Sequence, residues 1–287
     1  MVCSGGNDAF FNMGLDEVFL LSCQDENSSP ILRLYQWNPP GISLGYFQSI
    51  GKTIDVRKCQ QNGIDFVRRI TGGRAVLHEN ELTYSICASE KYYDKLGKNV
   101  NETYQKISFA FIEGLKILNI KADWVKPHLS SDSVTHTRLP SLPDGRQAGV
   151  GQDSLTVSPP CFSSFSRYEI TVLGKKLIGS AQRRFKNSFI QHGSLLLGKG
   201  NFDLSSFLPF SNKIDKRGKV FLEKSTNIED ILKQKVELKK IIETIKTGFE
   251  RFFEIELIEK EITREEKKQT LELKEKKYSS KKWNYLK

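Results

Sequence analysis

The chain has 287 residues, of which 38% are hydrophobic and 27% charged; this composition is typical of a globular enzyme and excludes a disordered or low-complexity chain. The length accommodates one large α/β domain with a small C-terminal appendage. A formal net charge of +10 suits an acidic protein partner, a nucleic acid or a membrane surface, and charge alone does not choose among them. The sequence shows no run of about eighteen apolar residues and no leader pattern, so we expect a cytoplasmic protein that does not enter a membrane.

Five cysteines are scattered along the chain, at Cys3, Cys23, Cys59, Cys87 and Cys161. Their number is odd and no CxxC pair occurs, which argues against a disulfide framework, a zinc site or a redox dithiol. Most lone cysteines are small buried hydrophobes. Cys161 directly follows two prolines, and this rigid approach keeps it a candidate nucleophile.

In the first half of the chain, the pattern predicts a helix followed by strands. The expected elements are a helix over 10–23 and strands over 31–35, 42–46, 66–70 and 81–88. Asn38-Pro39-Pro40-Gly41 is a turn signal between the first two strands. The stretch between the last two strands contains the glycine pair Gly72-Gly73, which makes this loop a candidate ligand-binding segment.

The second half continues the alternation of helix and strand. Helical spacing predicts helices over 101–118 and 241–253, and strands are expected over 168–173, 176–182 and 193–197, the first two flanking a hairpin turn at Gly174-Lys175. Residues 127–160 are rich in serine, threonine, proline and glycine, which predicts a mobile, exposed insertion. Lysines alternate with glutamates in the last thirty or so residues, and such runs are usually solvated helix faces.

Two short segments have the composition of a ligand site. In Arg68 to His78, two adjacent glycines after a strand let the backbone approach a ligand, although such a pair is more often a plain turn. In Gly174 to Gln182, a lysine in a strand precedes small residues that leave room for a ligand chain. A lysine beside a pocket can polarise a carbonyl or activate a thiol, but without context a surface lysine in a hairpin is the commoner case.

Taken together, the motifs resemble a known family over nearly the whole chain. The matching segments are 11–17, 37–39, 44–48, 71–74, 81–85, 179–182, 191–194 and 283–285. In order and spacing they resemble the lipoate and biotin protein ligase superfamily, in particular its cysteine-dependent octanoyltransferases. The resemblance implies an α+β (mixed α/β) fold whose central, mostly antiparallel sheet is flanked by helices. Length and charge pattern predict that the catalytic domain covers 1–255 and that a charged, helical tail covers 256–287.

The same resemblance assigns the site. Cys161 is the implied acyl-accepting nucleophile, and Lys176, fifteen positions later, is the implied lysine that lowers the pKa of the thiol and holds the thioester oxygen. The residues expected to bind substrate are Arg69, Thr71, Gly72, Gly73, Arg74, Ala75, His78, Gly179, Ser180, Ala181, His192 and Gly193. Two departures are visible, because Ile70 stands where relatives often have proline, and relatives usually lack so serine- and glycine-rich a stretch before the cysteine.

The implied activity is transfer of octanoyl from octanoyl-acyl carrier protein to a lysine of a lipoyl domain, such as the glycine-cleavage H protein. No cofactor or metal is expected, since the phosphopantetheine arm belongs to the donor. Two related activities remain as alternatives: an ATP-dependent lipoate ligase, and an amidotransferase that takes octanoyl from H protein. A basic nucleic-acid-binding module lacks any supporting motif here. Acyl length, natural acceptor and oligomeric state stay open.

Overall fold

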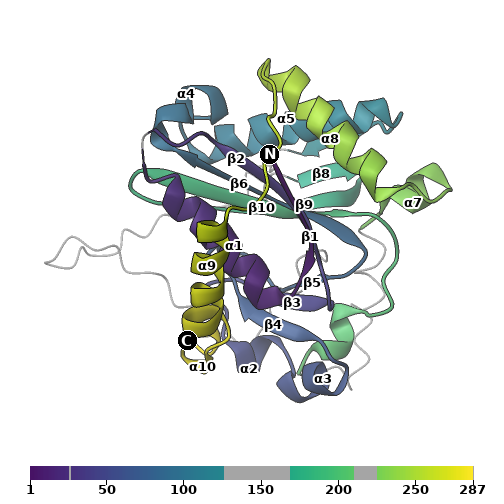
Figure 1. Ribbon diagram of the computed structural model, residues 1–287. Coiled ribbons are helices and arrows are strands. Elements are labelled where there is room, and N and C mark those ends of the chain that lie inside the picture. The colour runs from purple at the N-terminus through teal and green to yellow at the C-terminus, as the bar shows by residue number, and fades with distance from the viewer. Residues whose placement is uncertain (26, 126–168, 210–224, 287) are drawn as a thin grey trace, which may run out of the picture.

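The computed structural model describes residues 1–25, 27–125, 169–209 and 225–286. Two sheets and a set of helices form the α+β fold that the sequence predicts (Figure 1). The large sheet has the strand order β1-β2-β6-β10-β9-β8-β7, and the small sheet has the order β4-β3-β5. Only β1–β2 in the large sheet and β3–β4 in the small sheet pair in parallel among the described strands, so the central sheet is mostly antiparallel, as expected.

The strands are β1 (Val2–Asn7), β2 (Ile31–Trp37), β3 (Gly41–Leu44), β4 (Asp65–Arg68), β5 (Val76–His78), β6 (Glu81–Ser89), β7 (Asp123–Val125), β8 (Glu169–Val172), β9 (Lys175–Arg184) and β10 (Ser188–Leu196). The helices are α1 (Ala9–Ser22), α2 (Ile50–Thr53), α3 (Val56–Gln61), α4 (Tyr93–Leu96), α5 (Val100–Ile117), α7 (Ile228–Leu232), α8 (Leu238–Phe253), α9 (Arg264–Leu273) and α10 (Lys281–Asn284). Short 3-10 turns cover Glu90–Tyr92 and Leu204–Phe207, and a π-helical turn covers Lys274–Tyr278.

One face of the large sheet is covered by α5 and α8, which lie above it in Figure 1. Tyr84 and Ile178 of the sheet pack there with Phe111 of α5 and Phe249 of α8. The two helices approach closely because both have glycine at the crossing, and a Cβ on Gly248 would lie 2.3 Å from the Gly114 nitrogen. This face is apolar core and leaves no room for a substrate.

The opposite face of the large sheet packs on α1 and looks toward the small sheet (Figure 1). Asp8 caps the N-terminus of α1 by accepting hydrogen bonds from the Phe10 and Phe11 amides at 3.1 and 2.9 Å. Ionisable side chains are buried on this face, among them Asp16, Arg33 and His192. The functional groups are therefore expected between α1, the large sheet and the small sheet.

The hairpin between β8 and β9 turns at Leu173 and Gly174, one residue before the expected Gly174-Lys175 pair. Both turn residues have positive φ, +50° and +73°, as a two-residue hairpin of the favoured twist requires. β10 begins at Ser188, five residues before the expected strand start at Gly193. The extra length lets β10 pair with both β6 and β9 over the site.

The C-terminal residues pack onto the body of the protein. Lys274 pairs with Asp8 at 2.6 Å and Lys277 with Glu17 at 2.7 Å, so these two lysines are not on the solvated face that the charge pattern suggested. Arg68 is buried and donates to the carbonyl oxygens of Asn284 and Leu286 at 2.9 and 2.8 Å.

The domain boundary at residue 255 stays a prediction, and the expected insertion at 127–160 lies outside the described residues. None of the described helices combines the length and apolarity that a bilayer crossing needs.

Candidate active site

A narrow cavity of about 90 Å³ lies on the α1 side of the large sheet. Strands β9 and β10 form one wall, and the loop after β4 forms the other. Most of the residues predicted to bind substrate line it: Arg69, Gly73, Arg74, His78, Gly179, Ser180, Ala181, His192 and Gly193. Met13, Tyr35, Trp37, Ser43, Val76, Thr83 and Ser194 complete the lining. The structure thus brings two distant glycine-containing segments together around one space.

Arg69 fixes the loop that contains Gly72 and Gly73 through hydrogen bonds to its backbone carbonyls. The Arg69 Nη2 donates to the carbonyl oxygens of Gly72 and Arg74 at 2.7 and 2.8 Å, and Nη1 donates to the Ser43 carbonyl at 3.0 Å. Gly73 has a φ of +94°, a backbone conformation that residues other than glycine rarely adopt. Arg69 therefore shapes the cavity wall through the backbone.

Space around this loop is tight. A Cβ on Gly45 would lie 1.9 Å from the Gly73 carbonyl oxygen, and a Cβ on Gly193 would lie 2.3 Å from the Gly179 carbonyl oxygen. Of the predicted binding residues outside the lining, Ala75 is buried in the core of the small sheet and Gly72 is half-buried beside Phe47. Thr71 is the third, and its hydroxyl has a defined partner.

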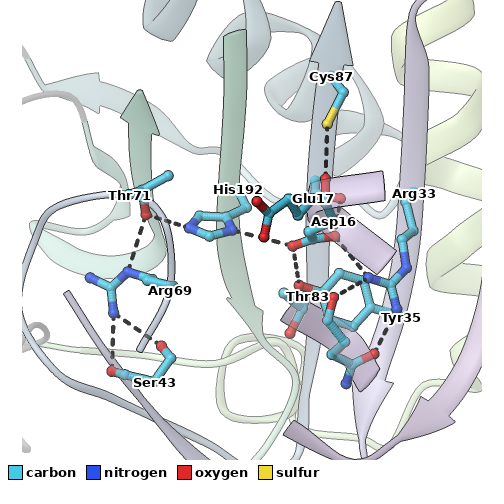
Figure 2. Close-up of polar contacts among 12 residues, drawn as sticks. Asp16, Glu17, Arg33, Tyr35, Ser43, Arg69, Thr71, Thr83, Cys87 and His192 are labelled. Atoms are coloured by element: carbon cyan, nitrogen blue, oxygen red, sulfur yellow. Dashed lines mark hydrogen bonds and ion pairs between the residues drawn. The ribbon is translucent and has the colours of Figure 1, made fainter. Parts of the chain in front are cut away.

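Figure 2 shows a hydrogen-bond chain that runs from Arg69 through Thr71 and His192 to Asp16. Thr71 Oγ1 lies 2.6 Å from His192 Nε2, and His192 Nδ1 lies 3.3 Å from Asp16 Oδ2. Burial lowers the pKa of His192 and so favours the neutral ring. The contact with Asp16 has the opposite effect on this pKa but is the smaller of the two. A neutral His192 that donates from Nδ1 to Asp16 accepts the Thr71 hydroxyl at Nε2, and every contact in the chain is then satisfied.

Asp16 is the centre of a buried polar network on α1. Arg33 Nη1 donates to Asp16 Oδ1 at 2.7 Å, and the hydroxyls of Tyr35 and Ser85 donate at 2.9 and 2.7 Å. Burial alone would raise the pKa of Asp16, but the Arg33 guanidinium, with hydrogen bonds from His192 and Ser85, holds it below its ordinary value. The carboxylate is therefore ionised and compensated at the floor of the site.

A second chain of the same type starts from Arg69 on the other side. Arg69 Nη1 lies 3.0 Å from Ser43 Oγ, which lies 2.7 Å from His78 Nε2, and His78 Nδ1 lies 2.6 Å from Glu81 Oε1. The His78 ring stacks on Trp37, with the ring centres 4.0 Å apart and the planes 5° from parallel. Two histidines thus wall the cavity, each fixed between a hydroxyl and a carboxylate.

Lys176 reaches the cavity side of the sheet because of a β-bulge. Between Ile170 and Thr171 the register advances one residue on β8 but two on β9, from Ile178 to Lys176, which leaves Leu177 as the extra residue. Leu177 and Ile178 accordingly both join the core under α5 and α8. Lys176 then faces away from this core, on the same side of the sheet as Gly179. The two residues are roughly 10 Å apart along the strand.

Lys176 is 1% exposed, and its Nζ donates to Glu169 Oε1 of β8 at 2.6 Å. Its neighbour Lys175 is exposed. Strict alternation from Gly179 would have turned Lys176 into the α5 face, so the bulge is what places Lys176 on the cavity side of the sheet. Bulges next to active sites often re-aim a side chain in this way.

The four described cysteines are not activated thiols. Burial raises the pKa of Cys23 and Cys59 to about 11, and it raises that of Cys87 well above the ordinary value. Cys3 is exposed at the first strand, and partial burial raises its pKa as well. The predicted nucleophile, Cys161, lies outside the described residues.

Several residues of the site escaped sequence reasoning. Asp16 and Glu81 appear in the sequence analysis only within the matching segments 11–17 and 81–85, and Arg33, Ser43 and Glu169 are not predicted as site residues. Their signal is weak along the chain, because the partner that gives each its role is not apparent from the sequence: Arg33 and Asp16, for example, are 17 residues apart. The available clue is a charged residue inside an otherwise apolar strand, as at Arg33.

Sequence and structure comparisons place these features among known proteins. The lipoyl protein ligase A/B catalytic domain matches residues 8–250. Octanoyltransferase LipM of Kyrpidia tusciae is 37% identical over 286 residues, which cover 99% of this chain and 97% of the relative. Octanoyltransferase LipM of Bacillus subtilis is 36% identical, with 98% and 96% covered.

Among solved structures, the chain is similar to a bipartite lipoate protein ligase from Thermoplasma acidophilum, described with its E2 lipoyl domain. The TM-score is 0.76 at 23% identity, with 100% of this chain and 96% of the other covered. A lipoate-protein ligase A bound with ATP gives a TM-score of 0.71 at 25% identity, with 99% and 97% covered. These likenesses support the fold, and the family follows from the sequence matches.

Proposed function

Because the chain belongs to the lipoyl protein ligase A/B catalytic domain family and is an octanoyltransferase within it, we propose that it transfers octanoyl from octanoyl-acyl carrier protein to a lysine of a lipoyl domain through a thioester on Cys161. The observation that carries the proposal is the bulge that places Lys176 on the same face of the large sheet as the cavity. A buried ammonium on that face serves a thiolate and a developing oxyanion. The expectation of an acyltransferase in lipoate biosynthesis is confirmed by the family.

The first step forms the acyl-enzyme. The Cys161 thiolate attacks the carbonyl carbon of the donor thioester, the new C–S bond forms, and the bond to the phosphopantetheine sulfur breaks. The departing thiolate takes a proton from the surroundings. Lys176 stabilises the attacking thiolate and then donates a hydrogen bond to the carbonyl oxygen as it gains charge. No nucleotide, metal or resident cofactor takes part in this proposal.

The second step forms the amide. The neutral ε-amine of the acceptor lysine attacks the Cys161 thioester, the C–N bond forms, and the C–S bond breaks to return the thiolate. The amine proton leaves to solvent or to the Cys161 sulfur. Thioester exchange is nearly balanced in free energy, whereas amide formation from a thioester is strongly favourable, so this step drives the overall transfer.

The cavity supplies the acyl-binding site in this proposal. Gly179, Ala181 and Gly193 carry little or no side chain, which leaves a narrow channel for an alkyl chain along β9 and β10. The two fixed histidines and Trp37 also line this channel. Arg69, Thr71 and Ala75 act on this channel through the loop backbone and its supports.

Both protein partners are proposals. A net charge of +10 favours acidic donor and acceptor domains over a neutral partner, through long-range attraction. We place the reaction in the cytoplasm, without a nucleic acid or membrane partner.

Intact-protein mass spectrometry tests the function. The protein is mixed with octanoyl-acyl carrier protein without nucleotide, and we expect an octanoyl adduct that peptide mapping assigns to Cys161. An adduct that forms only from octanoyl-H protein would instead support the amidotransferase. Octanoylation of apo H protein only with ATP and free octanoate, without an adduct, would support the ligase and contradict the proposal.

A further inference from the structure

Glu169 and Lys176 form a buried ion pair at the edge of the site. Their side chains are 0% and 2% exposed, and Lys176 Nζ lies 2.6 Å from Glu169 Oε1. They lie on adjacent strands, β8 and β9, seen side by side in Figure 1. A charge buried this deeply is stable only when it is compensated.

Both members face the cavity side of the sheet. Glu169 alternates with Ile170, which packs in the core under α5 and α8, so its side chain points away from that core. Lys176 joins it there because the bulge at Leu177 reverses the direction of its side chain. The carboxylate is therefore built into the same face that holds Gly179 and His192.

The proposed reaction changes the charge that faces Lys176. Before acylation, the Cys161 thiolate is a counter-ion for the ammonium. In the thioester the sulfur is neutral, so the thiolate no longer stabilises the buried ammonium. Without another anion, burial would favour loss of the lysine proton at the stage when the carbonyl oxygen needs a donor.

We propose that Glu169 is a positioning residue that keeps Lys176 charged and oriented in the acyl-enzyme, so that the ammonium donates to the thioester oxygen during attack by the acceptor amine. This inference rests on the proposed function. It assigns Glu169 to the second half-reaction, because in the first half-reaction the Cys161 thiolate also acts as a counter-ion of Lys176. No bond to Glu169 forms or breaks, and its carboxylate neither gains nor loses a proton.

The test separates the two half-reactions in Glu169→Gln. Glutamine keeps the size of the side chain and a hydrogen-bonding oxygen but removes the charge. We expect the Cys161 adduct to form from octanoyl-acyl carrier protein, while chase of that adduct with an apo lipoyl domain slows by about 10²-fold, the scale for loss of one oxyanion donor. Glu169→Asp, which keeps the charge, should recover part of the rate.

A pH series distinguishes this role from a purely structural one. Without the carboxylate, the ammonium is less stable and loses its proton at lower pH, so the ratio of variant to wild-type chase rate should fall as pH rises and recover in acid. Taking the ratio cancels the titration of the acceptor amine. The other carboxylates of the neighbouring elements, Asp123 of β7 and Glu229 and Asp230 of α7, are unchanged in every variant. In Glu169→Gln combined with Lys176→Arg, the ratio should not depend on pH, because a guanidinium stays charged.

Four outcomes are distinguishable. A ratio that does not vary with pH in Glu169→Gln, or equal losses in both half-reactions, overturns the role of Glu169. Normal chase in Glu169→Gln overturns it as well. Absence of the Cys161 adduct in the wild-type protein refutes the proposed function itself. Thermal unfolding of each variant identifies a folding defect, in which case Glu169→Asp and its pH series decide the question.

Discussion

Two buried ion pairs lie on the same face of the large sheet, and they are built differently. Asp16 is paired with Arg33, and it also accepts from Tyr35, Ser85 and His192. Glu169 is paired with Lys176, whose Nζ is a compact charge on a flexible stem. In the first pair, the planar Arg33 guanidinium is fixed within a hydrogen-bond network. In the second pair, the Lys176 ammonium can rotate from one acceptor to another.

The difference suggests a division of labour along the cavity. A guanidinium stays charged and holds several acceptors at set angles, which suits the buried network around Asp16 that fixes His192. An ammonium can exchange one acceptor for another, which suits a site where charge moves between sulfur and oxygen. The Arg33 pair should therefore matter most for stability, and the Lys176 pair most for chemistry.

The largest effect on stability is expected from Arg33→Met. This change leaves Asp16 buried without its cation, and breaking a buried pair in this way costs about 3–5 kcal/mol. Urea unfolding of the variant and the wild type measures the difference. Lys176→Met also leaves a carboxylate, Glu169, buried without its cation, but Arg33 additionally donates to Asn12 at 2.8 and 2.6 Å, so we expect the larger loss from Arg33→Met. A loss from Lys176→Met that equals or exceeds that from Arg33→Met would contradict this difference between the two pairs.

Lys176→Ala should mainly affect turnover. We expect transfer to fall by about 10²–10³-fold through loss of the oxyanion donor, and the pH midpoint for alkylation of Cys161 to move upward. Lys175→Ala is the matched control, because Lys175 is exposed and adjacent on the strand. A larger effect from Lys175→Ala would show that the bulge does not aim Lys176 at the reacting groups.

A smaller effect is expected from the pH dependence of stability at His192. Its pKa in the folded protein is lowered from 6.5, mainly by burial, so the unfolded chain binds the proton more readily. The stabilisation is complete above 6.5 and is lost as the pH falls below it. Unfolding free energies measured across this range should decline less steeply in His192→Gln. Equal slopes in the two proteins would mean that His192 is not the neutral link between Thr71 and Asp16.

Regular periodicity predicts most of this fold. Helices α1, α5 and α8 and strands β2 and β6 lie within a few residues of their expected bounds, because each has a long apolar pattern. β1 was not expected, since its Val2–Asn7 sequence contains two glycines and no alternation, and it is held by parallel pairing with β2. β5 is only Val76–His78, too short for a pattern to identify.

The candidate site is less predictable for a physical reason. The resemblance finds Lys176 and the glycine loop, which are contiguous motifs. It does not find the bulge at Leu177, because one extra residue in a strand leaves no mark on the sequence and reverses every side chain beyond it. Glu169 and Asp16 gain their roles only when separate strands and helices bring their partners to them.

The most direct test of the account uses the isolated acyl-enzyme. Octanoyl-enzyme freed of donor is mixed with an apo lipoyl domain, without nucleotide, and both proteins are followed by intact mass over time. We predict that octanoyl leaves Cys161 and appears on the acceptor lysine at a rate no slower than overall turnover, and that Cys161→Ala neither carries nor transfers it. An adduct that stays in place or hydrolyses while overall transfer proceeds, or an active Cys161→Ala protein, would contradict the covalent mechanism.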